Sequence, residues 1–128
     1  MKPLRDFEIN RAEKEGVQIL RLLGQLDNTQ LSRLQGVLEN LQQAGRNQIV
    51  INCENIDYMS STAIRALADS SKVARDAGGG MILVLVPAHI RSIIDLCGLT
   101  EEFRFSEKEK DAIALFTPGE PSDKDKTT

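Results

Sequence analysis

The spacing of hydrophobic residues along this chain switches between the period of a strand and the period of a helix, and each switch predicts a new element. Residues 7–11 and 17–23 are short apolar-rich runs, and the polar stretch between them ends in Gly16, which suits a hairpin turn. After Gly24, leucines recur at helical spacing until residues 44–45 supply a C-terminal stop. The pattern predicts an antiparallel strand pair followed by an amphipathic helix over residues 28–44.

The middle of the chain repeats the strand-to-helix change. Residues 48–52 form a compact β-branched run that predicts a strand, followed by a loop. A second helical period then runs through Ser71 and stops at the three glycines of residues 78–80, which we interpret as a C-cap and turn. Residues 81–86 are apolar without alternation, which is typical of a strand covered on both faces, so we expect them in mid-sheet.

The last third predicts three short elements and a tail. A short amphipathic helix follows Pro87 and closes at Gly98, residues 103–106 suit a final strand, and residues 111–116 suit a last helix. Residues 117–128 offer nothing to bury, so we expect a disordered tail after one domain over residues 1–116. Alternating strands and helices predict an α/β fold: a single mixed, mostly parallel sheet of about five strands with helices packed against it.

Composition excludes several classes of function. The 128 residues suit one domain, and the net charge of −3 with 4% aromatic residues argues against nucleic acid as a partner. The start of the chain lacks the apolar core of a signal peptide, and no apolar run approaches the ~20 residues that span a bilayer. We therefore expect a cytoplasmic protein that does not insert into membranes.

The remaining isolated residues predict no metal site and no cofactor. Cys53 and Cys97 lie far apart without a paired ligand spacing, so we expect two reduced, buried thiols. His89 is the only histidine and has no cysteine or acidic ligand pattern near it, which favours a surface or capping role. The mixed charges of residues 107–111 are interpreted as a solvated face.

Three consecutive hydroxyl residues, Ser60, Ser61 and Thr62, stand where the second helix is expected to begin. One interpretation is helix capping, in which one serine oxygen accepts an unpaired backbone N–H and the other hydroxyls are solvated. The other is phosphorylation, because a phosphate at a helix N-terminus faces free N–H groups and the positive end of the helix dipole. Spacing alone leaves both interpretations open.

Three segments resemble the motifs of one family, the STAS-domain anti-sigma factor antagonists. Residues 57–64, DYMSSTAI, resemble its Asp-Ser-Ser-Gly-Leu signature, and residues 23–27, LGQLD, resemble its Gly-Glu-Leu-Asp motif. Residues 79–99 resemble its Gly-Gly…Gly-Leu segment. The resemblance covers residues 6–116 and implies the STAS fold.

The resemblance also implies a mechanism and a site. In that family a partner serine kinase with an ATP-binding domain, which is itself the anti-sigma factor, phosphorylates the first serine after the motif aspartate, and a serine phosphatase reverses the change. This role falls on Ser61, and the partner-binding surface falls on Asp27, Ser60, Thr62 and Arg65.

Two features modify this assignment. Asp27 also suits an N-cap of the first helix, with Gln30 placed as in a capping box, and this is compatible with partner contact. Ser60 stands where the family motif has aspartate, and Ala63 stands where it has glycine.

Three functions compete at this point. The first is a phosphorylation-gated binding protein that sequesters an anti-sigma kinase, and the second is a constitutive STAS scaffold subunit of a stressosome or a lipid-transport ATPase complex. The third is a serine hydrolase using Ser60 or Ser61, which would need a base oriented by an acid. The Gly-x-Ser-x-Gly elbow is absent and His89 is the sole imidazole, so we expect a binding protein and not an enzyme.

Overall fold

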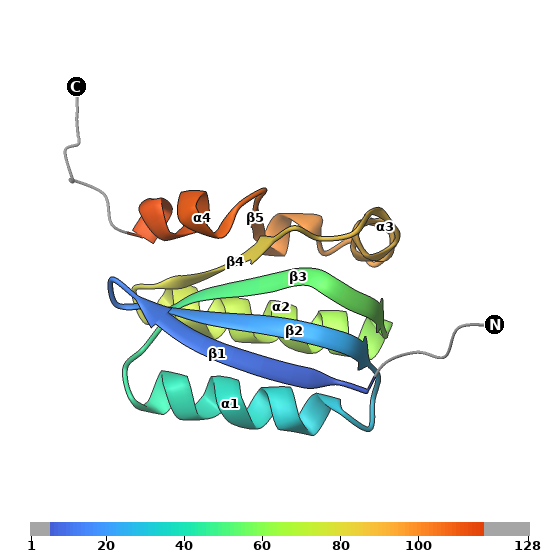
Figure 1. Ribbon diagram of the computed structural model, residues 1–128, viewed down its shortest axis with the longest axis horizontal. Coiled ribbons are helices and arrows are strands. Elements are labelled where there is room, and N and C mark those ends of the chain that lie inside the picture. The colour runs from blue at the N-terminus through green and yellow to red at the C-terminus, as the bar shows by residue number, and fades with distance from the viewer. Residues whose placement is uncertain (1–5, 117–128) are drawn as a thin grey trace.

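The computed structural model describes residues 6–116, which form one five-stranded sheet in the order β1-β2-β3-β4-β5 with helices on both faces (Figure 1). The predicted order of elements is confirmed. The elements are β1 (Glu8–Lys14), β2 (Val17–Leu26), α1 (Leu31–Gln43), β3 (Gln48–Met59), α2 (Ser61–Asp76), β4 (Gly80–Val84), α3 (Ala88–Leu96), the 3₁₀ helix η1 (Thr100–Glu102), β5 (Arg104–Ser106) and α4 (Glu109–Phe116).

The sheet is mixed, as predicted. β1 pairs antiparallel with β2, whereas β2, β3, β4 and β5 are mutually parallel. The β1–β2 hairpin closes on Glu15 and Gly16, whose φ angles of 55° and 80° suit the two-residue turn that matches strand twist. The parallel arrangement places the carboxyl ends of four strands at one edge of the sheet.

β3 is longer than the sequence predicts. It continues to Met59, whereas the hydrophobic run ends at Asn52 and a loop is expected beyond it. The extension pairs with the last residues of β2, up to the pair Leu26 and Met59, after register shifts on either side of Gly24. The predicted loop is therefore wrong, because hydrogen bonds from β2 hold a segment whose own side chains show no strand pattern.

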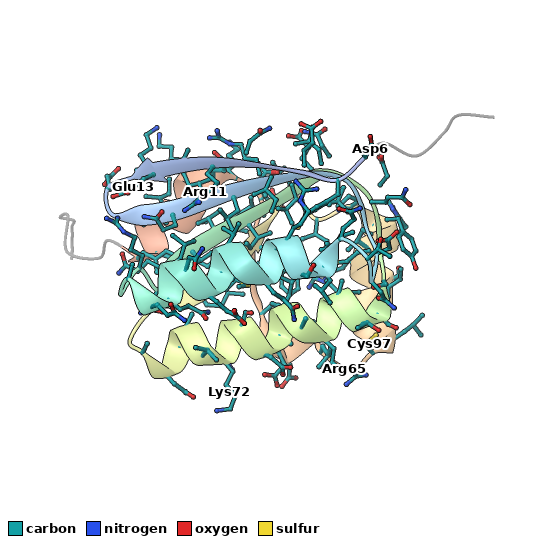
Figure 2. The ribbon with its side chains drawn as sticks, turned by 90° about the horizontal axis from the view of Figure 1, so that it is seen from below. Asp6, Arg11, Glu13, Arg65, Lys72 and Cys97 are labelled. Atoms are coloured by element: carbon teal, nitrogen blue, oxygen red, sulfur yellow. The ribbon has the colours of Figure 1, made fainter. Side chains whose placement is uncertain are left out.

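Helices cover the two faces of the sheet unequally. α1 and α2 run side by side across one face (Figure 2), and α3 adds Ile90 and Ile94 to the same hydrophobic cluster. α4 lies on the opposite face (Figure 1), where Ala112 and Ile113 pack in a smaller cluster. Every residue of β4 is buried, which confirms that this strand is covered on both faces.

Glu109 fastens α4 to the sheet. Its carboxylate accepts two hydrogen bonds of 2.8 Å from Arg21 and one of 2.7 Å from Asn52. The hydrogen bond from Arg21 is the main cause that holds the pKa of Glu109 below its ordinary value. The interpretation of residues 107–111 as a solvated face is thus wrong for Glu109, since its partners come from strands far away in the sequence.

α1, α2 and α3 each end in the same way, on a glycine with positive φ. Gly45, Gly78 and Gly98 have φ angles of 76°, 93° and 71°, and each residue after them donates its N–H back to the helix, as in a Schellman motif. This confirms the predicted C-cap at residues 78–80. Gly79 is needed for space, because a Cβ there would lie 2.0 Å from the main-chain oxygen of Asn47.

The two cysteines differ from one another. Cys53 is fully buried and free, and burial raises the pKa of its thiol to about 12, so it stays protonated. Cys97 is free but only half-buried, so the expectation that both thiols are buried is wrong for it. Within residues 6–116, no helix is long and apolar enough to cross a bilayer. The predicted tail, residues 117–128, lies outside the described residues.

Candidate functional site

The predicted site residues lie where β2 and β3 end. Leu26 and Met59 are paired as the last residues of these two parallel strands, and Ser60 N–H donates to the Leu26 carbonyl at 3.0 Å. The β2–α1 loop and the start of α2 therefore leave the sheet next to each other. This is the edge at which open α/β sheets place their binding sites.

Ser60 is the residue that caps α2. Its Oγ accepts a hydrogen bond from the backbone N–H of Ala63 at 3.1 Å and donates to Asn28 Oδ1 at 2.8 Å. Its backbone is extended, with φ −73° and ψ 157°, as an N-cap requires. One hydroxyl of the three is thus committed to structure, and it also ties α2 to the β2–α1 loop.

Ser61 and Thr62 are the first two residues of α2, and both are exposed. Neither hydroxyl has a hydrogen-bond partner among residues 6–116. Arg65 follows Ser61 by four residues, so the two side chains share one face of the helix. Arg65 is exposed and forms no ion pair with any residue that the structure describes (Figure 2). The start of α2 therefore offers a free hydroxyl beside a free cation and the positive end of a helix dipole.

Asp27 organises the loop beside Ser60. Its Oδ1 accepts from the Thr29 hydroxyl at 2.6 Å and from the backbone N–H groups of Thr29 and Gln30 at 3.0 and 3.1 Å. These bonds, the Thr29 hydroxyl first, hold the pKa of Asp27 below its ordinary value, so the carboxylate is charged at neutral pH. Only half of the predicted capping box forms: Asp27 accepts from the Gln30 N–H, but the Gln30 side chain accepts from Arg33 at 3.1 Å. Asp27 thus caps the turn that precedes α1, whose own N-cap residue is Gln30.

Sequence reasoning missed the neighbours of this site. His89 is exposed, as expected, but its Nε2 lies 2.9 Å from the Asp57 carbonyl and links the start of α3 to the end of β3. Tyr58 is 42% exposed at the same edge, where it adds an aromatic surface. Its exposure next to buried Met59 follows from the extension of β3, which no sequence pattern signalled. Asn28 gave no local signal, since its bond to Ser60 spans 32 residues.

Among residues 6–116, no imidazole or carboxylate hydrogen-bonds the hydroxyl of Ser60 or Ser61. The imidazole of His89 lies 2.9 Å from the main-chain oxygen of Asp57 and hydrogen-bonds no serine among the described residues. It is therefore not placed as the base that would activate a serine nucleophile. Among residues 6–116, no three His, Cys, Asp or Glu side chains are grouped to hold a metal ion. The described surface offers the fixed carboxylate of Asp27, the free hydroxyls of Ser61 and Thr62, the guanidinium of Arg65 and the exposed ring of Tyr58.

Comparisons with known proteins agree with this fold. The sequence pattern of the STAS domain matches residues 8–112. The chain is 23% identical over 107 residues to BtrV of Bordetella bronchiseptica, which is provisionally described as an anti-sigma factor antagonist; the match covers 84% of this chain and 92% of BtrV.

Solved structures are similar over almost their whole length. An anti-sigma factor antagonist from Mycobacterium paratuberculosis superposes with a TM-score of 0.79 at 18% identity, covering 88% of this chain and 96% of that one. The Bacillus cell fate determinant SpoIIAA, solved in its phosphorylated form, superposes with a TM-score of 0.66 at 19% identity, covering 86% of this chain and 98% of that one. At such identities these two structures support the fold alone.

Proposed function

This chain belongs to the STAS domain family, and from that premise we propose that it is an anti-sigma factor antagonist whose binding surface is switched off by phosphorylation of Ser61. The observation that carries the proposal is that two neighbouring serines have different surroundings. Ser60 caps α2, whereas Ser61 is exposed and its hydroxyl is uncommitted among the described residues. A kinase can therefore modify Ser61 without removing the cap that holds the helix.

The start of α2 can accept a phosphate without unfolding. A phosphoserine at the first helical position faces backbone N–H groups and the positive end of the dipole, an interaction of about 0.3–1 kcal/mol at an exposed site. Arg65 lies one turn further along the same face and adds a cation. The phosphoprotein should keep its fold but lose affinity for its partner, because the phosphate adds a charge of about −1.5 to −2 to the docking surface.

The docking surface consists of Asp27, Ser60, Thr62 and Arg65 around Ser61. Within residues 6–116, Asp27 Oδ1 accepts three hydrogen bonds, from Thr29 and Gln30, so Oδ2 can accept from a partner. The partner that fits the proposal is an anti-sigma factor with an ATP-binding domain and serine kinase activity, and a serine phosphatase restores the binding form. SpoIIAA, a structural relative, has been solved both unphosphorylated and phosphorylated, which supports a switch of this kind. We place the exchange in the cytoplasm.

The test starts from the partner kinase recovered by pull-down from the native lysate. Incubation with that kinase and ATP, followed by mapping of the phosphate by mass spectrometry, should place it on Ser61 and not on Ser60 or Thr62. Ser61→Ala should abolish labelling while the affinity for the kinase persists. Ser61→Glu should weaken binding about tenfold, or about 1.4 kcal/mol, although one carboxylate only partly mimics a phosphate.

Gln43→Glu is the matched control, since it adds the same charge at the exposed C-terminal end of α1, away from the site. It should leave kinase affinity unchanged. Phosphate on Thr62, or no phosphate with an active cognate kinase, would instead favour the constitutive scaffold. Recovery of transporter or stressosome subunits in the pull-down, with no kinase, would point the same way.

A further inference from the structure

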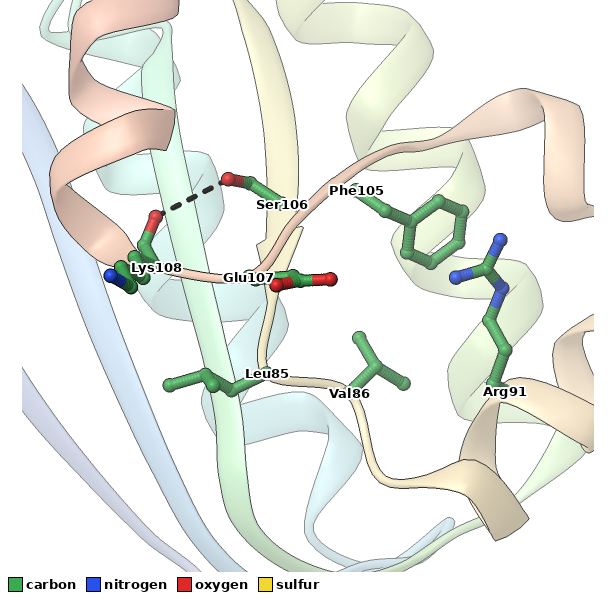
Figure 3. A pocket seen from close by; sticks show the side chains of 7 residues that line it. All are labelled: Leu85, Val86, Arg91, Phe105, Ser106, Glu107 and Lys108. Carbon is green, nitrogen blue, oxygen red and sulfur yellow. Dashed lines mark hydrogen bonds between the residues drawn. The ribbon is translucent and has the colours of Figure 1, made fainter.

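A cavity of about 590 Å³ opens at the carboxyl ends of β4 and β5, between the connections that follow these strands (Figure 3). Its apolar wall includes Leu85, Val86 and Phe105. The volume lies within the range of about 300–1,000 Å³ that is usual for small-molecule sites. None of the residues of the proposed docking surface lines this cavity, so it is a separate feature of the molecule.

Arg91 presents a fixed guanidinium to the cavity. The group stacks over the Phe105 ring at 3.6 Å from the centroid, which orients its plane. Its Nε lies 4.0 Å from Asp95, a loose ion pair, and its terminal nitrogens donate no hydrogen bond to any residue among 6–116. A guanidinium with both terminal nitrogens free is suited to binding a carboxylate through two parallel hydrogen bonds.

Glu107 faces Arg91 from the other side. Figure 3 shows its carboxylate and the Arg91 guanidinium directed toward one another, with the Phe105 ring and Val86 bordering the space between them. The two groups are not within 4.0 Å, and Glu107 forms no ion pair with any residue that the structure describes. Lys108 also lines the cavity, but Figure 3 shows its ammonium directed away from Arg91, Val86 and Phe105. The part of the cavity beside Val86 and Phe105 is therefore bordered by two opposite charges, Arg91 and Glu107, that form no ion pair with each other.

The backbone at the mouth of this cavity is strained. Leu85 has a φ of 56°, a left-handed conformation that leucine rarely adopts, and its side chain is 38% exposed. Its N–H donates to the Ser106 carbonyl at 3.3 Å, which helps to hold it there. Strain of this kind concentrates at ligand-binding segments, and the carboxyl edge of a parallel sheet is where such segments bind ligands.

We propose that this cavity binds a small zwitterion with an apolar side group, of the amino acid or dipeptide class. The carboxylate of the ligand pairs with Arg91, its ammonium pairs with Glu107, and its apolar group lies against Phe105 and Val86. A simple anion would meet repulsion from Glu107, and a simple cation would meet repulsion from Arg91. Only a ligand that carries both charges satisfies both groups, so the arrangement selects for zwitterions.

The probes are L-phenylalanine and L-alanyl-L-phenylalanine, which differ in the separation of their charges. Their controls are 3-phenylpropionate, which lacks the ammonium, and 2-phenylethylamine, which lacks the carboxylate. Titration of the full ¹⁵N-labelled chain followed by ¹H–¹⁵N correlation spectra should give saturable shifts at the amides of Leu85, Val86 and Glu107 with at least one zwitterion. The singly charged controls should bind at least about tenfold more weakly.

Two charge-removing variants test the two ends of the ligand separately. Arg91→Gln should weaken the binding of the zwitterion and of 3-phenylpropionate about tenfold and leave the binding of 2-phenylethylamine no weaker. Glu107→Gln should weaken the binding of the zwitterion and of 2-phenylethylamine about tenfold and leave the binding of 3-phenylpropionate no weaker. Lys110→Gln, which removes an exposed charge outside the cavity, should change neither, and spectra of each variant check its fold. The proposal is overturned if neither zwitterion saturates below about 10 mM, if a singly charged control binds equally well, or if the variants that fold keep full affinity.

Discussion

Replacing Ser60 by alanine removes both hydrogen bonds that its hydroxyl makes at the start of α2. One is the cap itself, accepted from Ala63 N–H at 3.1 Å, and the other is donated to Asn28 at 2.8 Å. The mutation leaves the Ala63 N–H without its protein partner and removes the side-chain link to the β2–α1 loop, while the backbone bond to Leu26 remains. Stability should fall, although Ser60 touches little of the hydrophobic core.

The size of this loss follows from the two bonds. Replacing a serine N-cap by alanine costs about 0.5–2 kcal/mol, typically about 1. The second bond is exposed to water, so its net contribution is at the low end of the usual range, about 0.5 kcal/mol. We expect Ser60→Ala to lower the free energy of unfolding by about 1–2 kcal/mol. With an m-value of about 1–3 kcal/mol/M in urea, the midpoint should fall by roughly 1 M.

Urea unfolding followed by circular dichroism, on three variants in parallel, measures this effect. Ser61→Ala should stay within about 0.5 kcal/mol of the original chain, because its hydroxyl is exposed and alanine favours helices. Ser60→Asp should keep most of the stability, since aspartate is an equally good N-cap and its charge suits the helix dipole, but it cannot donate to Asn28 and should lose that bond. The same variant also restores the aspartate of the family motif.

The reverse ranking would refute the reasoning. If Ser60→Ala were neutral and Ser61→Ala were costly, the cap would be Ser61 and the helix would begin one residue later. Ser61 would then be a structural hydroxyl, and the proposal that it is the phosphoacceptor would lose its main support.

Three further substitutions probe the opposite face of the sheet, its opposite edge and the middle of α1. Glu109→Gln should cost about 1 kcal/mol in unfolding free energy, because it removes a partly exposed pair with Arg21. The pKa of Glu109 is lowered in the folded state, so the stability that its carboxylate contributes is fully present above the unfolded pKa of about 4.3 and is lost as the pH falls through the folded pKa. In thermal scans between pH 7 and 3, the difference in stability between Glu109→Gln and the original chain should therefore become smaller as the pH falls. Gly79→Ala should lower the free energy of unfolding by about 2 kcal/mol or more, because its Cβ would lie 2.0 Å from the Asn47 carbonyl oxygen. A Cβ at Gly36 would meet nothing within 4 Å, so Gly36→Ala should stabilise α1 by about 0.5–1 kcal/mol. Equal effects of the two substitutions in urea unfolding would contradict the close approach at Gly79.

Much of the fold was predictable because its signals are local. The helical spacing of leucines in α1, the apolar run of β4 and the glycine stops each lie within one element, and the order of strands and helices then limits the sheet to a largely parallel one. The candidate site was predictable in part for the same reason. Three hydroxyls before a helical period mark a helix start wherever the chain is placed in space.

The tertiary structure decided which hydroxyl caps α2. Ser60 is fixed as the cap by backbone contact with Leu26 and by its bond to Asn28, and both partners lie on another strand and loop. Residue spacing alone did not decide between Ser60 and Ser61 as the cap, since either could begin the helix. The same is true of Asp27, which bonds Thr29 as well as the Gln30 N–H, while the Gln30 side chain accepts from Arg33 and does not reach back to it.

The sequence by itself determined the elements, their order and the position of the hydroxyl cluster, because periodicity and turn chemistry act over a few residues. Only the tertiary structure decided the extension of β3 to Met59, the attachment of Glu109 to Arg21, and the facing charges of Arg91 and Glu107. Each of these depends on groups from distant segments that meet when the sheet forms. No local pattern encodes such a meeting, because the partner's position is set by the packing of the whole sheet.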